Sequence, residues 1–170
     1  MTRSLTIAVL VAQAVSAPVV VTVAQPASVS LVPGSKGEGR LTVTVKNGYH
    51  VQANPASEPN LIPLRLEMES DSRVRTGKPI YPAGRPYRLT GAESDLSIYD
   101  GTFEIRLPLD APRGAAPGEL TLKGALLYQA CNDRLCLRPA SVPVSLVVKV
   151  AAPAKSSQGP PALALPGLTN

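Results

Sequence analysis

Two apolar arms around a short polar turn make up residues 119–150, which read ELTLKGALLYQACNDRLCLRPASVPVSLVVKV. The arms, residues 119–131 and 136–150, are rich in Val and Leu, which suit strands. The segment between them, Asn132-Asp133-Arg134-Leu135, opens with two residue types that favour turns. We therefore predict an antiparallel β-hairpin whose loop is this polar segment.

The rest of the chain repeats short apolar runs between turn residues. Leu41-Thr42-Val43-Thr44-Val45 alternates apolar and polar residues with period two, the pattern of a half-buried strand. No segment of about ten residues or more carries an apolar stripe with helical spacing. Roughly seven or eight short strands predict an all-β sandwich, although the Cys-Trp-Cys pattern of antibody domains is absent. The other strand candidates are residues 29–32, 61–69, 85–89 and 103–107, and the turn signals are residues 33–37, 47–48, 82–84, 100–101 and 112–114.

The composition agrees with a strand-rich globular domain and argues against a nucleic-acid-binding protein. Eighteen prolines and thirteen glycines would interrupt helices too often for a helical fold. Because the chain has no Trp and one Phe, its core must rest on Val, Leu and Ile. The net charge of +5 is spread along the chain without a run of basic residues, so we expect no nucleic-acid partner.

The N-terminal segment resembles an export signal. Arg3 is followed by the apolar residues 5–15, and small residues suited to cleavage occur further on. We place the signal at residues 1–24, with cleavage after either Ala17 or Ala24. Because the stretch carries no charge after Arg3, an uncleaved membrane anchor is the alternative.

A folded domain is expected over residues 25–150. Beyond it, residues 151–170 are rich in Pro and Ala and predict a disordered tail. The protein would then be periplasmic or otherwise exported, either free or tethered by its N-terminus.

Cys131 and Cys136 are the only cysteines, and they flank the predicted turn. In an oxidising compartment, cysteines this close usually pair. A symmetric loop would set them opposite each other with their Cα atoms about 4.5 or 5.5 Å apart, which suits a disulfide. A ring this small contributes only about 2 kcal/mol through chain entropy. The bond is therefore either a modest clamp on the hairpin or a reactive redox pair.

The cysteine segment YQACNDRLCLRP, residues 128–139, resembles the signature of the N-terminal periplasmic domain of the thiol:disulfide interchange protein DsbD. Four other segments are similar to that family and occur in the same order, so the resemblance covers about residues 28–150. These segments are GYHVQAN at 48–54, LIP at 61–63, GKPIYP at 77–82 and IYDG at 98–101.

The resemblance implies an immunoglobulin-like antiparallel β-sandwich in which Cys131 and Cys136 are the redox-active pair. It also implies electron transfer from a thioredoxin-like reductant to oxidised extracytoplasmic proteins, including disulfide isomerases and cytochrome-maturation proteins. Complete family members continue into a membrane domain and a thioredoxin domain, so we expect a membrane-linked DsbD-like reductase to act in trans. The chain would be a thiol–disulfide oxidoreductase component with no metal and no small-molecule cofactor.

Four residues are candidates for a supporting role beside the cysteines: Tyr128, Asn132, Arg134 and His50. The charge of Arg134 would lower a thiol pKa, whereas Asp133 would oppose that effect. His50, the only histidine, is either a polar residue beside a turn or an accessory group that tunes the thiolate. A metal site built from His50 and both cysteines lacks an obvious fourth ligand. We expect Tyr128 to be a residue of the core or of the rim of the site and not a catalytic group.

The resemblance further implies a cap loop that shields the disulfide with an aromatic side chain. Its expected counterpart, residues 88–97, contains no aromatic residue, which leaves Leu89 or Leu96 for that role. A second hypothesis stays open, in which the chain is a non-catalytic immunoglobulin-like binding or assembly module and the disulfide only braces the hairpin.

Overall fold

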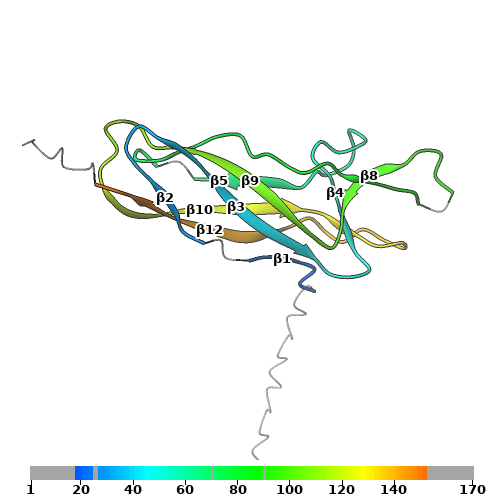
Figure 1. Ribbon diagram of the computed structural model, residues 1–170. Coiled ribbons are helices and arrows are strands. Elements are labelled where there is room, and N and C mark those ends of the chain that lie inside the picture. Colours follow the sequence, from blue (N-terminus) through cyan, green and yellow to red (C-terminus); the bar gives the residue numbers. More distant parts are fainter. Residues whose placement is uncertain (1–17, 25–26, 70, 90, 153–170) are drawn as a thin grey trace, which may run out of the picture.

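The computed structural model describes residues 18–152 except residues 25–26, 70 and 90. All regular structure within these residues is β-strand, and three four-stranded sheets form the molecule. Figure 1 shows the long strands β3, β9, β10 and β12 running along an elongated body, with β4 and β8 toward one end. The predicted all-β sandwich is confirmed.

The first sheet has the strand order β1-β3-β9-β6, and all its pairs are antiparallel. Its long strand β3 shows the predicted alternation, because Leu41, Val43 and Val45 are buried while the threonines between them face outward. The strands are β1 (Val21–Val23), β3 (Lys36–Val45), β6 (Arg75–Thr76) and β9 (Thr102–Asp110).

The second sheet has the order β2-β12-β10-β5 and contains the predicted hairpin. The arms β10 and β12 pair antiparallel from Gly118↔Val150 to Tyr128↔Ala140. The edge strand β2 pairs with β12 in parallel. The strands are β2 (Val29–Leu31), β5 (Arg65–Met68), β10 (Gly118–Tyr128) and β12 (Ala140–Val150).

These two sheets enclose the core between them. A Cβ added at Gly39 of β3 would lie 2.6 Å from Cδ2 of Leu146 in β12, so the strands approach closely there. Leu and Ile side chains from both sheets fill the space, and burial of each contributes roughly 1.5–3 kcal/mol. The largest fully buried ones in β3, β9, β10 and β12 are Leu41, Ile105, Leu107, Leu109, Leu126 and Leu146.

The third sheet, with the order β11-β4-β8-β7, joins segments that are far apart in the sequence. Figure 1 shows β4 and β8 near the turn end of the β10–β12 hairpin. The strands are β4 (His50–Gln52), β7 (Arg85–Tyr87), β8 (Leu96–Tyr99) and β11 (Ala130–Cys131).

A change of register carries the tip of the hairpin from the second sheet into the third. Between the Tyr128↔Ala140 pair and the Cys131↔Cys136 bridge, residues 129–130 of the first arm face residues 137–139 of the second, so the second arm has one extra residue. An extra residue of this kind bends a strand and increases its twist. As a result β11 leaves β12 and pairs with β4, where Cys131 lies opposite His50.

The chain enters the fold earlier than the predicted domain boundary at residue 25. Val20 and Val21 are buried in the core, and β1 pairs with β3. The predicted signal falls mostly on residues 1–17 and the predicted tail mostly on 153–170, and both ranges lie outside the described residues. Across the part of the chain that the structure describes, no helix is long and apolar enough to cross a membrane.

Candidate redox site

Cys131 and Cys136 form a disulfide at the tip of the hairpin. Their Cα atoms are 4.0 Å apart, somewhat closer than the spacing expected from a regular ladder. Backbone hydrogen bonds flank the bond on both sides, from Leu137 N–H to Ala130 O at 2.8 Å and from Asn132 N–H to Leu135 O at 3.0 Å. The predicted pairing of the two cysteines is therefore present in a closed, hydrogen-bonded tip.

The two cysteines differ sharply in exposure. Cys131 is only 4% exposed, because β11 is covered by its neighbour β4. Cys136 is exposed and forms an isolated bridge with Cys131. A large partner molecule can therefore reach Cys136, whereas Cys131 lies behind it.

The loop between the cysteines is held by Asn132. Its Oδ1 accepts hydrogen bonds from the backbone N–H groups of Arg134 at 2.9 Å and Leu135 at 3.0 Å, which is how Asn commonly fixes a turn. Leu135 is 53% exposed beside Cys136 and gives the tip an apolar surface. Asn132 thus shapes the loop.

A pocket of about 430 Å³ lies beside the disulfide. Three of the four predicted supporting residues line it, namely His50, Asn132 and Arg134. Tyr128 does not line this pocket and is buried in the main core. The remaining lining residues are Gln52, Leu61, Leu89, Leu96, Cys131, Asp133, Leu135 and Cys136.

The segment proposed as a cap loop reaches this pocket through leucines. Leu89, in the connection between β7 and β8, and Leu96, the first residue of β8, both line it. An ion pair between Arg88 Nε and Asp95 Oδ1, 2.6 Å apart, joins the two ends of that connection. These leucines give the pocket an apolar wall in the segment where the family resemblance implies an aromatic side chain.

An aromatic side chain does lie near the disulfide, but it comes from strand β7. The ring of Tyr87 lies 4.5 Å from that of His50, centroid to centroid, at an angle of 45°. Its hydroxyl donates a hydrogen bond to the Asp133 carboxylate in the tip loop, and this bond raises the pKa of Tyr87. Sequence reasoning missed Tyr87, because only the fold brings β7 to the loop.

An ion pair extends this arrangement away from the disulfide. Arg85 donates from Nε to Oδ1 of Asp100 at 2.8 Å, and its guanidinium lies 5.6 Å from the centre of the Tyr87 ring. The hydrogen bond from Arg85 lowers the pKa of Asp100. Asp100, Arg85, Tyr87 and His50 therefore form a continuous polar row leading to the cysteines.

His50 and Gln52 are buried polar residues, and each has one side-chain atom without a hydrogen-bond partner in the described part of the chain. Their exposed fractions are 4% and 2%, and neither His50 Nε2 nor Gln52 Oε1 has a hydrogen-bond partner among the described residues. Burial is the largest cause that lowers the pKa of His50, and Arg85 adds to it, while Asp133 and Asp100 act in the opposite direction. Such orphaned groups are costly in a folded protein and call for an explanation.

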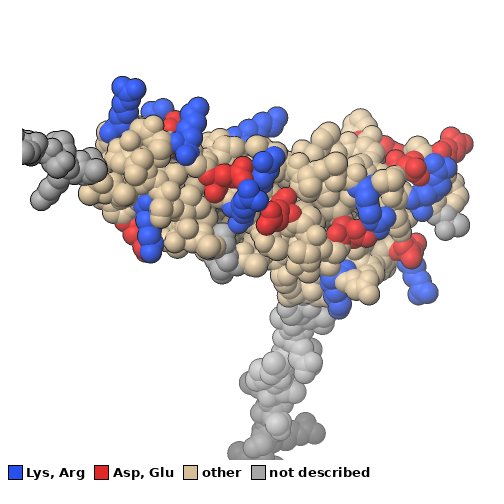
Figure 2. Space-filling model, in the orientation of Figure 1, with Lys and Arg blue, Asp and Glu red and all other residues tan. Residues whose placement is uncertain are grey.

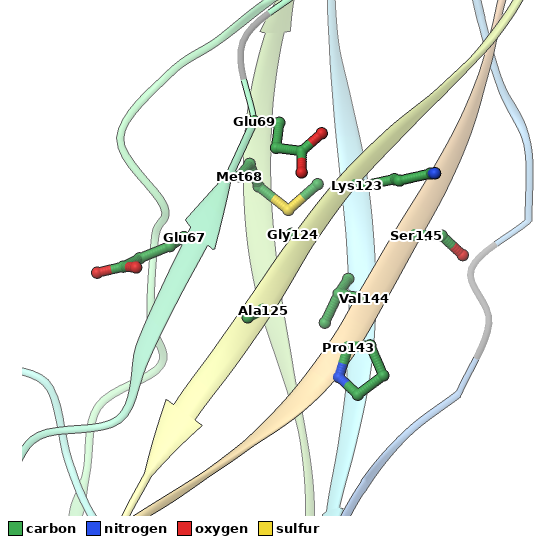
Figure 3. Close-up of a pocket in the computed structure, with 9 residues that line it drawn as sticks. All are labelled: Glu67, Met68, Glu69, Lys123, Gly124, Ala125, Pro143, Val144 and Ser145. Atoms are coloured by element: carbon green, nitrogen blue, oxygen red, sulfur yellow. The ribbon is translucent and has the colours of Figure 1, made fainter.

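A larger pocket lies elsewhere and contains neither cysteine. It is a groove of about 680 Å³ across β5, β10 and β12 (Figure 3), where the Met68 side chain lies beside Gly124. Within the described residues, no group of three or more His, Cys, Asp or Glu side chains could hold a metal ion. In the view of Figure 2, acidic and basic residues are interspersed along the surface. Among the described residues, the reactive cysteine pair lies at the disulfide pocket.

Comparison with known proteins identifies the family. The family described as "Thiol:disulfide interchange protein DsbD, N-terminal" matches residues 17–147. The solved N-terminal periplasmic domain of ScsB from Proteus mirabilis is similar in fold, with a TM-score of 0.53 and 15% identity. That match covers 81% of this chain and 50% of the other, so the chain spans about half the length of the solved domain.

A second solved structure, the periplasmic chaperone SfaE, has 15% identity and a TM-score of 0.38, with 78% of this chain and 58% of the other covered. That score is too low for a fold assignment. A search of curated proteins found no match. The likeness to ScsB agrees with the immunoglobulin-like sandwich predicted from the sequence, and the match over residues 17–147 shows that the chain belongs to the family of DsbD N-terminal domains.

Proposed function

We propose that this chain is an exported thiol–disulfide exchange module that relays electrons through Cys131 and Cys136. The observation that carries the proposal is the unequal exposure of a disulfide at a hairpin tip, with Cys136 accessible and Cys131 buried beside a pocket. Exchange requires that one sulfur can be approached by an external thiolate. Membership of the DsbD N-terminal family supports the same conclusion.

The exchange follows from this asymmetry. In the reduced protein, the Cys136 thiolate attacks a partner's disulfide, so a mixed disulfide forms and the partner's other sulfur leaves as a thiolate and takes up a proton. The Cys131 thiolate then attacks Cys136 Sγ, re-forms the internal disulfide and releases the partner's first sulfur. Two electrons pass from the dithiol to the partner. The same steps in reverse reduce the chain.

The partners that suit this chemistry are thioredoxin-fold proteins. A thioredoxin-like reductant, linked to a DsbD-like membrane protein acting in trans, would supply the electrons in the periplasm or another extracytoplasmic compartment. Oxidised proteins, including those of disulfide isomerisation and cytochrome maturation, would receive them. The exposed Leu135 beside Cys136 provides an apolar contact for such partners.

A second candidate is a binding module in which the disulfide is only structural. The observation in its favour is that hydrogen bonds to Asn132 within the loop and from Tyr87 to Asp133 fix the shape of the tip and so hold the two cysteines together. A disulfide between cysteines that the fold already holds together would be hard to reduce. Potentials below about −300 mV are typical of such structural disulfides, whereas exchange proteins lie between about −180 and −270 mV.

Trapping of a mixed disulfide tests the proposal. The reduced Cys131→Ser variant keeps the accessible Cys136 and should form a stable adduct with a thioredoxin-fold protein whose second active-site cysteine is replaced by Ser and whose remaining cysteine is activated as a disulfide with a small aromatic thiol, which leaves as its thiolate; the adduct is seen on a non-reducing gel and by mass spectrometry. The matched Cys136→Ser variant keeps only the buried thiol and should trap little or none. A potential below about −300 mV, together with no adduct from either variant, would favour the structural reading.

A further inference from the structure

We infer that His50 exchanges a proton with Cys131 as the disulfide opens and closes, an inference that rests on the proposed exchange function. The pair comes from two strands, since His50 begins β4 and Cys131 ends β11. Nothing in the spacing of the sequence places them together, because 80 residues separate them. The fold does, and it does so at the buried end of the disulfide.

The register of the third sheet sets the two side chains face to face. His50 and Cys131 are directly opposed in the antiparallel pair β4–β11. Residues in such a position point to the same side of the sheet, with their Cβ atoms about 4.5–5.5 Å apart. Both line the pocket beside the disulfide. Val51 and Ala130, the next pair in the register, belong instead to the main core.

Burial creates the need for a proton acceptor. When the disulfide opens, Cys131 must pass through the thiolate form in a site where it is only 4% exposed. An apolar, buried setting disfavours that charge and raises a thiol pKa. A neighbouring group that takes the proton leaves an imidazolium beside the thiolate, and this opposite charge offsets the cost.

The orphaned polar atoms provide an independent observation. His50 Nε2 and Gln52 Oε1 are fully buried without hydrogen-bond partners while Cys131 is oxidised. In the oxidised form, Cys131 carries no proton and can donate nothing to them. Reduction creates an S–H group at the residue opposite His50. In the proposed mechanism this S–H group donates to His50 Nε2 and supplies the partner that this atom lacks while Cys131 is oxidised.

His50 also connects the buried site with solvent. It lines a second pocket, of about 490 Å³, together with polar groups of the strands and loops packed around it. A proton that His50 accepts can therefore leave on that side and need not pass the disulfide. The charged and titratable groups that line this second pocket are Tyr49, Arg85, Tyr87, Asp100 and Asp133.

Each bond and each proton is accounted for in the proposed steps. In the mixed disulfide, the Cys131 thiol gives its proton to neutral His50 and its thiolate attacks Cys136 Sγ. The Cys131–Cys136 bond forms, the Cys136–partner bond breaks, and the released partner thiolate takes up a proton from solvent, while His50 returns its proton to solvent. In the opposite direction, protonated His50 donates to the Cys131 thiolate that leaves.

The environment keeps His50 ready to accept a proton. Burial, with help from the positive charge of Arg85, lowers its pKa, so the imidazole is neutral near pH 7. Asp133 and Asp100 pull the pKa upward and stabilise the imidazolium once it forms. The Tyr87 ring packs against the imidazole at a tilt of 45° and restricts its orientation.

Nuclear magnetic resonance of the single histidine gives the first test, because its ring protons need no assignment among others. The His50 pKa should be lower in the reduced protein than in the oxidised protein, because the Cys131 S–H group donates a hydrogen bond to Nε2 of the neutral imidazole and so favours the neutral form. In a reduced Cys131→Ala variant, which has no donor at this position, this decrease should disappear. An identical His50 titration in the oxidised and reduced wild-type protein would overturn the inference.

The rate of resolution gives the second test. His50→Gln keeps a polar side chain but cannot take a proton, so its mixed disulfide with an oxidised thioredoxin-fold protein should accumulate and resolve about a hundredfold more slowly at pH 7. Its resolution rate should rise about tenfold for each pH unit between pH 6 and 8, as for an unassisted thiol with a pKa above that range. The wild-type rate should rise less steeply.

The two proposals fail in distinguishable ways. If wild-type protein exchanges and His50→Gln resolves at the same rate with the same pH slope, the role of His50 is wrong and the exchange function stands. If neither wild type nor Cys131→Ser forms any mixed disulfide, the exchange function itself is wrong. Thermal unfolding of His50→Gln shows whether the variant is folded, and the pH slope is a readout that lost stability alone would not change.

Discussion

Single hydroxyl groups hold together the sheet that carries the cysteines. The hydroxyl of Tyr99 in β8 accepts a hydrogen bond from Asn54 N–H at 3.1 Å and donates one to the Pro82 carbonyl at 2.9 Å. These two contacts fix the segments that follow β4 and precede β7, and Tyr99 is only 4% exposed. The geometry around His50 therefore depends on a residue that does not line the pocket.

We expect Tyr99→Phe to destabilise the protein by about 1 kcal/mol, because it leaves a part-buried N–H and a part-buried C=O without their partner. The free energy of unfolding in urea measures this loss. Tyr128→Phe is the matched control. Tyr128 is also buried, but no hydrogen bond to its hydroxyl is found among the described residues, so its change should be smaller. Equal losses in the two variants would contradict the assigned role of the Tyr99 hydroxyl.

The disulfide was predictable from single residues, whereas its surroundings were not. Two cysteines flanking a turn in an exported chain indicate a bond from spacing alone. Tyr87 and Gln52 gave no signal, because their importance comes from contacts across sheets. His50 was recognised as the lone histidine, but its burial and its missing partner follow only from the fold.

At the scale of elements, the hairpin arm β10 is shaped by its contact with the edge strand β5. The two strands pair from Gly124↔Met68 to Leu127↔Arg65. A Cβ at Gly124 would lie 2.5 Å from Met68 Sδ and 3.1 Å from Met68 Cα, and closer still to the backbone oxygen of Glu67. Glycine is therefore required at this point of β10 so that β5 can lie against it.

We expect Gly124→Ala to cost about 1–3 kcal/mol of stability, because the added methyl group forces the backbone of β5 away from β10. Gly114→Ala is the matched control, since a Cβ there would meet no atom within 4 Å. The control should change stability by about 0.5 kcal/mol or less. Chemical denaturation measures the free energy of unfolding of both variants. An unchanged value for Gly124→Ala would show that β5 moves away from β10 without a loss of stability.

The sequence predicted the long strands, which show period-two alternation, and also the short strands β2, β5 and β7, which match the candidates at residues 29–32, 61–69 and 85–89. β3, β9, β10 and β12 each bury every second residue over much of their length, as the sequence pattern indicated. β4 buries all its residues and β8 nearly so, so neither alternates. β1 and β6 are too short to carry a pattern. The missed strands thus include β4, which holds His50.

Across the whole molecule, the candidate site is assembled where a third sheet closes one end of the sandwich. The hairpin tip supplies the disulfide, β4 supplies His50, and the connection between β7 and β8 supplies the leucines. Local patterns predicted the sandwich but gave no information on which loops meet at its end. The family resemblance supplied part of that information, since it named both a cysteine pair and a cap segment.

The stability of the whole fold also depends on the residue at which a mature chain would begin. Val20 and Val21 are 3% and 0% exposed, and β1 pairs with β3 from Val21↔Val45 to Val23↔Val43. Cleavage of an export signal after Ala24 would remove this strand, whereas cleavage after Ala17 would keep it. Burial of two valines contributes roughly 3–6 kcal/mol, an upper estimate because unfolded chains already bury some surface.

We therefore expect a chain that begins at residue 18 to be more stable than one that begins at residue 25 by several kcal/mol, up to about 6. Urea unfolding of the two chains measures the difference, and mass spectrometry of the exported protein should find Pro18 as its first residue. Equal stability would mean that β1 is dispensable. A loss confined to the shorter chain would mean that the sandwich needs β1 to cover the edge of β3, and that cleavage after Ala24 would expose the core beneath it.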